Sequence, residues 1–161
     1  MKRSEINKII EEAAEFLGEH KFLLPPFAYF TAAEWKEKNH EYDEIRRNCL
    51  GWDITDFGSG DYKKCGLFLF TLRNGNAHNP DDHKVYAEKI MIVDENQTTP
   101  YHYHWYKQED IINRGGGNLM IKVYAADEND EFSADDVEIQ VDGRHYKVPA
   151  GSVIRLTPGM S

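Results

Sequence analysis

Apolar residues near the start of the chain recur at the spacing of an amphipathic α-helix, with glutamate and lysine between them. The pattern predicts a helix that packs one face on the body of the domain. Ser4 is the expected N-cap of this helix, and Gly18 is its expected end. The apolar positions that define it are Ile6, Ile9, Ile10, Ala13, Phe16 and Leu17.

Two shorter helices are expected before residue 50. Thr31 and Glu34 have the spacing of a capping box, in which each side chain accepts a hydrogen bond from the backbone N–H of the other residue. A second helical stretch is predicted from 42 to 47, and the Gly-Trp-Asp sequence at 51–53 ends it. Residues 1–50 are therefore expected to form a helical N-terminal extension.

After residue 50 the pattern changes to short strands joined by turns. Residues 66–72 are apolar on both faces, which is typical of an internal strand. Asp142 and Gly143 form a strong hairpin signal between two alternating segments. The expected strands are 66–72, 85–93, 101–105, 118–125, 137–141, 144–148 and 152–156. Helices followed by many short strands predict a mainly β protein, with 1–50 packed on an antiparallel barrel or sandwich over 51–161.

Composition and charge narrow the classes of partner. The 161 residues carry a formal charge of −9, which disfavours binding to the phosphate backbone of nucleic acids. No apolar run approaches the ~20 residues that span a bilayer, and the N-terminus lacks the apolar core of a signal peptide. We therefore expect a cytoplasmic protein without nucleic-acid or membrane partners. The two cysteines, Cys49 and Cys65, are expected to be buried thiols rather than a disulfide scaffold.

The candidate chemistry lies between residues 99 and 118. If the chain from 101 forms a strand, His102 and His104 project from one face, and Glu109 follows five residues later. Two imidazoles and a carboxylate suit manganese, iron, zinc, cobalt or nickel, whereas calcium prefers oxygen ligands only. An isolated His-x-His pair is also common on exposed strands. The carboxylate and the glycine cluster at 115–117 favour the metal site.

Residues near the carboxylate offer two further readings. Asp110 and Arg114 follow Glu109 closely. They could orient the metal ligands through hydrogen bonds, or they could hold the turn formed by the glycine cluster.

The spacing of His102, His104, Glu109 and Gly116 resembles the first motif of the cupin superfamily. Together with 51–58, 69–75 and 109–118, it makes the chain similar to the D-lyxose ketol-isomerase family of bacterial cupins, from the N-terminal helix to Ser161. The resemblance implies a cupin-type antiparallel β-barrel (jelly roll) with the helical extension at 1–50. The barrel over 51–161 is expected to be partial, because the family's second cupin motif would continue beyond Ser161.

The resemblance also implies an activity and a set of site residues. The family interconverts an aldose and a ketose, D-lyxose and D-xylulose, with D-mannose and D-fructose as a second pair. His102, His104 and Glu109 match three of its four metal ligands, with Mn²⁺ as the favoured ion, and Lys89 matches a catalytic lysine that lines its sugar site. The fourth ligand and a proton-transferring carboxylate would lie beyond Ser161. Related cupins commonly form homodimers.

Other readings of the same residues stay open. Lys89 could be an ordinary surface lysine on a strand. The chain could be an inactive portion of a longer isomerase, or a non-catalytic cupin module that binds metal or sugar. A cupin dioxygenase would use a similar metal site with a redox-active ion.

Overall fold

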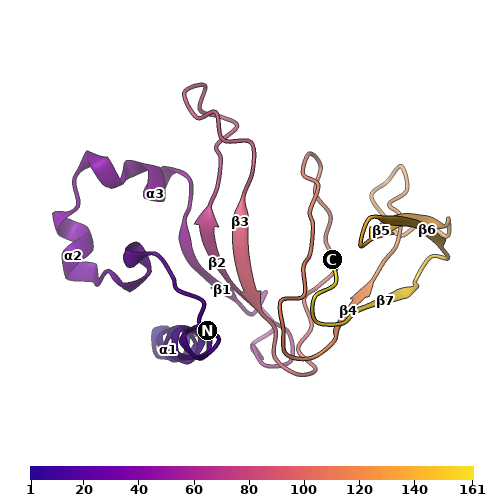
Figure 1. The fold of residues 1–161 in the computed structure, drawn as a ribbon, viewed down its shortest axis with the longest axis horizontal. Helices are drawn as coiled ribbons and strands as arrows, with labels where there is room; N and C mark the ends of the chain where they lie inside the picture. Colours follow the sequence, from indigo (N-terminus) through magenta and orange to yellow (C-terminus); the bar gives the residue numbers. More distant parts are fainter. The chain divides into compact units, whose positions relative to one another are not determined.

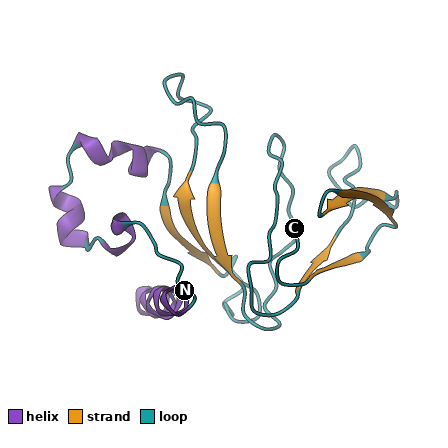
Figure 2. Ribbon diagram, viewed as in Figure 1, coloured by secondary structure: helices purple, strands orange, loops and turns teal.

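The computed structural model describes residues 1–161 and divides into two compact units, Met1–Tyr101 and His102–Ser161. All helices and three strands belong to the first unit, as Figures 1 and 2 show. The helical elements are α1 (Arg3–Glu19), η1 (Pro26–Tyr29), α2 (Ala32–Glu37), η2 (His40–Tyr42) and α3 (Asp43–Arg47). The strands are β1 (Gly51–Thr55), β2 (Leu67–Arg73), β3 (Glu88–Ile92), β4 (Leu119–Lys122), β5 (Val137–Val141), β6 (Arg144–Val148) and β7 (Val153–Leu156).

The predicted fold class is confirmed at the level of its sheets. The strands form three antiparallel sheets in the orders β1-β2-β3, β4-β7 and β5-β6, and no sheet closes into a barrel. This arrangement is consistent with an incomplete cupin fold. The helical elements end at Arg47 and the strands begin at Gly51. The division of the chain into a helical extension at 1–50 and a partial barrel at 51–161 stays a prediction. None of the helices has the length and apolar character that crossing a membrane requires.

The ends of α1 differ from the sequence-based expectation. Lys2, rather than Ser4, is the N-cap, and the carboxylate of Glu5 accepts a hydrogen bond from the Lys2 backbone N–H. The helix also continues through Gly18 to Glu19, since a glycine ends a helix only where the chain turns into the left-handed conformation.

The capping box of α2 is confirmed. Oγ1 of Thr31 accepts from the Glu34 backbone N–H at 3.2 Å, and Oε2 of Glu34 accepts from the Thr31 backbone N–H at 2.7 Å. The two side chains thereby satisfy backbone donors that a helix start leaves without partners.

The core of the first unit lies between α1, η1 and one face of the β1-β2-β3 sheet. β2 is the central strand, as its apolar sequence predicts, and Phe70 on it is 0% exposed. Trp52 of β1 and Ile90 of β3 flank Phe70 in the register, and Leu17 of α1 belongs to the same apolar cluster. The Trp52 indole N–H donates to the carbonyl of Ala28 at 2.8 Å, which attaches η1 to the sheet.

The second unit is built from two strand pairs. β5 and β6 have the bounds predicted from alternation, and the turn between them places Asp142 at φ 48° and Gly143 at φ 77°. Positive φ at both turn residues is the signature of a type I′ turn, which matches the twist of a two-residue hairpin. The Asp-Gly pair therefore sets the register of this hairpin.

Three expectations are wrong. β1 was expected only as the end of a helix, yet Trp52 and Ile54 pair with Phe70 and Phe68 of β2. Residues 101–105 form no strand. The cysteines are not buried: Cys49 is exposed and Cys65 is half-buried, and both are free thiols.

Candidate metal centre

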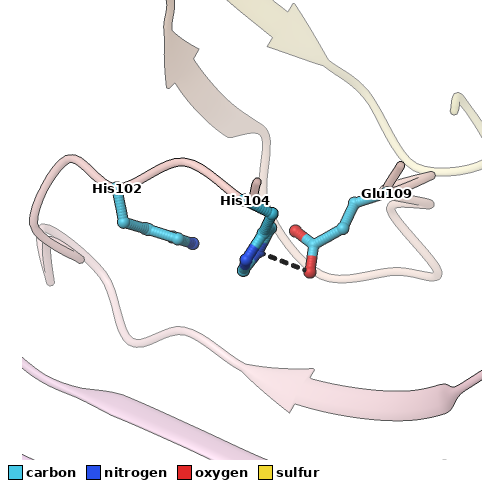
Figure 3. A group of neighbouring side chains, drawn as sticks. All are labelled: His102, His104 and Glu109. Carbon is cyan, nitrogen blue, oxygen red and sulfur yellow. Dashed lines mark ion pairs between the residues drawn. The ribbon is translucent and has the colours of Figure 1, made fainter. Parts of the chain in front are cut away.

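The segment that carries the histidines has no regular secondary structure, but it brings the three candidate ligands together. His102, His104 and Glu109 each offer one donor atom, and these atoms all lie within 4.8 Å of one another. Figure 3 shows His104 in the middle, with the imidazole of His102 and the carboxylate of Glu109 pointing toward it. The grouping predicted from the spacing is therefore present without the strand that was expected to create it.

One distance within the group fits adjacent positions around one ion. Nε2 of His104 lies 2.9 Å from Oε1 of Glu109. Two ligand atoms at right angles, each about 2.1 Å from an ion, are about 3.0 Å apart. The imidazole rings of His102 and His104 are neighbours, with centroids 5.3 Å apart and an inclination of 75°.

The environment of His104 also fits a metal ligand. Its Nε2 atom is buried and makes no hydrogen bond of acceptable geometry, although Oε1 of Glu109 is close. A buried polar atom without a hydrogen bond is costly, and coordination to a cation removes that cost. The donor chemistry and the orphaned nitrogen thus both fit a divalent transition metal.

Two neighbours of the ligands were not identified from the sequence. Nζ of Lys107 lies 4.0 Å from Oε1 of Glu109 and forms an ion pair with it. Partial burial raises the pKa of the Tyr103 hydroxyl, and the nearby carboxylate of Asp130 raises it further. No spacing rule marks either contact in advance, because both depend on how irregular loops fold.

Lys89 lies in the first unit and is exposed on β3, where it pairs with Thr71 of β2. Strand alternation puts it on the sheet face opposite the one that carries Ile90 and Phe70. α1 and η1 cover the Phe70 face, so the Lys89 side chain is directed away from them. The catalytic role expected for Lys89 stays a prediction.

Comparison with known proteins agrees with the resemblance noted from the motifs. A family model described as D-lyxose isomerase matches residues 1–161. A protein of Escherichia coli O157:H7 named D-lyxose/D-mannose isomerase is 47% identical over 162 residues, which cover 100% of this chain and 71% of the relative. A protein of Serratia proteamaculans with the same name is 44% identical over the same shares of the two chains. Since the family model matches the whole chain and both relatives are named for one activity, the chain belongs to the D-lyxose isomerase family of sugar isomerases.

Proposed function

We propose that this chain binds one divalent metal ion through His102, His104 and Glu109 and acts as an aldose–ketose isomerase on D-lyxose and D-mannose. The observation that carries the proposal is the convergence of the three donor atoms within 4.8 Å. The two relatives, both named D-lyxose/D-mannose isomerase, support the choice of substrates. Isomerisation of D-lyxose gives D-xylulose, and isomerisation of D-mannose gives D-fructose.

Mn²⁺ is the ion we favour. Calcium prefers oxygen ligands only, so a site with two imidazole nitrogens disfavours it. Manganese accepts carboxylate and imidazole ligands together. The isomerisation requires no net oxidation, so the ion needs no redox change. Three protein ligands leave coordination positions on a six-coordinate ion for the oxygens of a sugar.

The chemistry divides between the ion and the chain. A divalent ion held by these residues would polarise the sugar carbonyl and stabilise the negative charge that develops during proton transfer. The neutral nitrogens of His102 and His104 and the carboxylate of Glu109 give the ligand set a single negative charge, which leaves the bound centre positive. Such a centre attracts the carbonyl and hydroxyl oxygens of the substrate.

Lys89 completes the proposed set of functional residues. Its exposed ammonium group has three donor hydrogens and is accessible to a ligand on the sheet face away from the helices. We assign it to hydrogen bonding with a sugar oxygen, on the strength of the family resemblance. We also propose that the chain forms a homodimer, adopts a cupin-type barrel and acts in the cytoplasm. Light scattering of the purified protein tests the dimer.

The test is the manganese content of purified protein, measured by mass spectrometry after equilibration with Mn²⁺. We expect near-stoichiometric metal in the wild type and loss of most of it in H102A, H104A and E109Q. His145 is exposed on β6, so H145A is a matched control that should keep its metal. Unchanged metal content in all three ligand variants would disprove the assignment.

Activity is measured separately, as ketose formation from D-lyxose and from D-mannose. Formation of D-xylulose and D-fructose in the presence of Mn²⁺ is the expected result. Saturable sugar binding without turnover would instead support a binding module, and oxygen consumption with ferrous iron would support a dioxygenase.

A further inference from the structure

Asn113 is one of only two buried residues in the second unit, with 7% of its surface exposed, and it uses its side chain fully. Its amide Nδ2 donates to the carbonyls of Gly117 and Leu156, both at 2.9 Å. Its Oδ1 accepts from the backbone N–H of Gly115 at 3.1 Å. Both N–H groups of the amide and its oxygen are therefore engaged, and no smaller or charged side chain reproduces the set.

The backbone of Asn113 makes two more hydrogen bonds to the segment that follows β7. Its N–H donates to the carbonyl of Met160 at 2.9 Å, and its carbonyl accepts from the N–H of Gly159 at 2.7 Å. Asn113 thus joins three segments of the second unit: the glycine turn at 115–117, the end of β7 and the turn at 157–160.

These are the hydrogen bonds that the chain between residues 110 and 117 makes. Asp110 and Arg114, the two residues that the sequence offered for this role, form no hydrogen bond or ion pair. The glycine turn is therefore held by Asn113 instead. Gly116 at φ 81° supplies the left-handed residue that this turn needs.

Asn113 stands four residues after Glu109. Four residues of extended chain reach at most about 14 Å, so a fixed Asn113 limits where the Glu109 carboxylate can go. A ligand that is already restrained pays less conformational entropy when it binds a metal than one on a free loop.

We propose that Asn113 is a positioning residue for the metal centre, which raises metal affinity by holding the Glu109 segment against the end of β7. The proposal rests on the metal site proposed above. Asn113 does not touch the ion in this arrangement and acts only through Glu109. Without its side chain, the site keeps its three ligands but must order one of them on binding.

The first experiment compares N113A with N118A. Asn118 is also an asparagine of this loop but is exposed and makes no hydrogen bond, so N118A is a matched control. Calorimetric titration of each protein with Mn²⁺ measures the dissociation constant. We expect it to rise about 10- to 100-fold in N113A and to stay unchanged in N118A. Circular dichroism verifies that both are folded. Equal affinity in N113A and wild type would overturn the proposal.

A double-mutant cycle separates positioning from a general loss of structure. Ni²⁺ is the probe, because nickel binds histidine more strongly than manganese does and keeps measurable affinity for His102 and His104 alone. If Asn113 acts through Glu109, N113A weakens Ni²⁺ binding in the wild-type background and has no further effect in E109Q. The same fold-change in both backgrounds would mean a structural role only and would overturn the proposal.

Hydrogen exchange of the wild type provides a test that needs no variant to fold. Coupling is reciprocal, so an anchor that favours metal binding must itself be stabilised by the metal. Mn²⁺ should slow exchange at the amides of Asn113, Gly115 and Gly159 and leave the β5-β6 hairpin unchanged. Unchanged exchange at these three amides overturns the inference about Asn113. A wild type that binds neither Mn²⁺ nor Ni²⁺ overturns the proposed function as well.

Discussion

Each of the two units of the chain is stabilised internally by a different kind of interaction. In Met1–Tyr101 an apolar core of side chains such as Phe70 and Leu17 fills the space between α1, η1 and a three-stranded sheet. In His102–Ser161 only Leu156 and Asn113 are buried, and the amide of Asn113 donates to the Leu156 carbonyl. The first unit thus depends mainly on hydrophobic burial and the second on turns and hydrogen bonds. The candidate metal ligands all belong to the second.

The largest expected effect is the loss of a core side chain from the first unit. Phe70→Ala removes a fully buried ring that packs on Trp52 at 4.7 Å and on Phe27 at 5.5 Å between centroids. We expect the free energy of unfolding to fall by about 3–5 kcal/mol. Leu156→Ala in the second unit should cost only about 2 kcal/mol, because the apolar cluster does not extend to it and its surroundings can relax.

Urea denaturation of both variants measures these values. Phe57→Ala, at a side chain that is 45% exposed, serves as the control and should change stability by less than about 0.5 kcal/mol. A larger loss in Leu156→Ala than in Phe70→Ala would show that the second unit has a core of its own, and the contrast between the units would fail.

The same glycine-to-alanine change should have opposite signs in the two units. Gly143 has a positive φ of 77° in the β5-β6 turn, so Gly143→Ala should cost about 1–2 kcal/mol of stability. Gly18 lies inside α1 with no atom within 4 Å of an added Cβ, so Gly18→Ala should stabilise by roughly 0.5–1 kcal/mol. Thermal unfolding measures both changes, and the idea fails if Gly143→Ala is neutral, because the second unit would then not depend on its turns.

The sequence predicted elements whose signals are local. The β5-β6 hairpin was predicted to its bounds because alternation and an Asp-Gly turn act over a few residues. The capping box at Thr31 and Glu34 is equally local. β1 was missed because Gly51 and Asp53 are residue types that strands disfavour, so pairing with β2 decides its conformation.

Residues 101–105 show the opposite error. Their tyrosines and tryptophan favour strands, but that preference reflects packing on a half-buried surface, and Tyr103 and Trp105 are exposed. His102, His104 and Glu109 still converge, because close spacing in the sequence limits how far apart three ligands can lie. Asn113 could not be identified in this way, since its partners Leu156 and Met160 are more than forty residues away.

The smallest expected change in stability concerns Asn48, which we call the polar anchor of the first unit. The loop between β2 and β3, which extends past the strands in Figure 1, is attached to the end of α3 through Asn48, only 2% exposed. Nδ2 of Asn48 donates to the carbonyl of Asn74 at 2.9 Å and to Oδ2 of Asp82 at 2.6 Å. Asn48 thus resembles Asn113 in donating both amide hydrogens, but one of its partners is a titratable carboxylate and its Oδ1 is buried without a hydrogen bond.

The two anchors should therefore differ in their response to acid. The Lys84 backbone N–H, followed by the Asn48 amide, holds the pKa of Asp82 below its usual range. A carboxyl with a lowered pKa in the folded state stabilises above its unfolded value of about 3.9, and this contribution is lost as the pH falls through the lower folded value. Urea denaturation should accordingly find Asp82→Asn less stable than wild type by a constant amount from about pH 7 to 5, with the gap closing below about pH 4. Asn113 has no titratable partner, so the gap between N113A and wild type should show no such closing. If the Asp82→Asn gap is the same at pH 7 and pH 3, the charge of Asp82 contributes nothing to its anchor, and the two units are alike in relying on neutral hydrogen bonds.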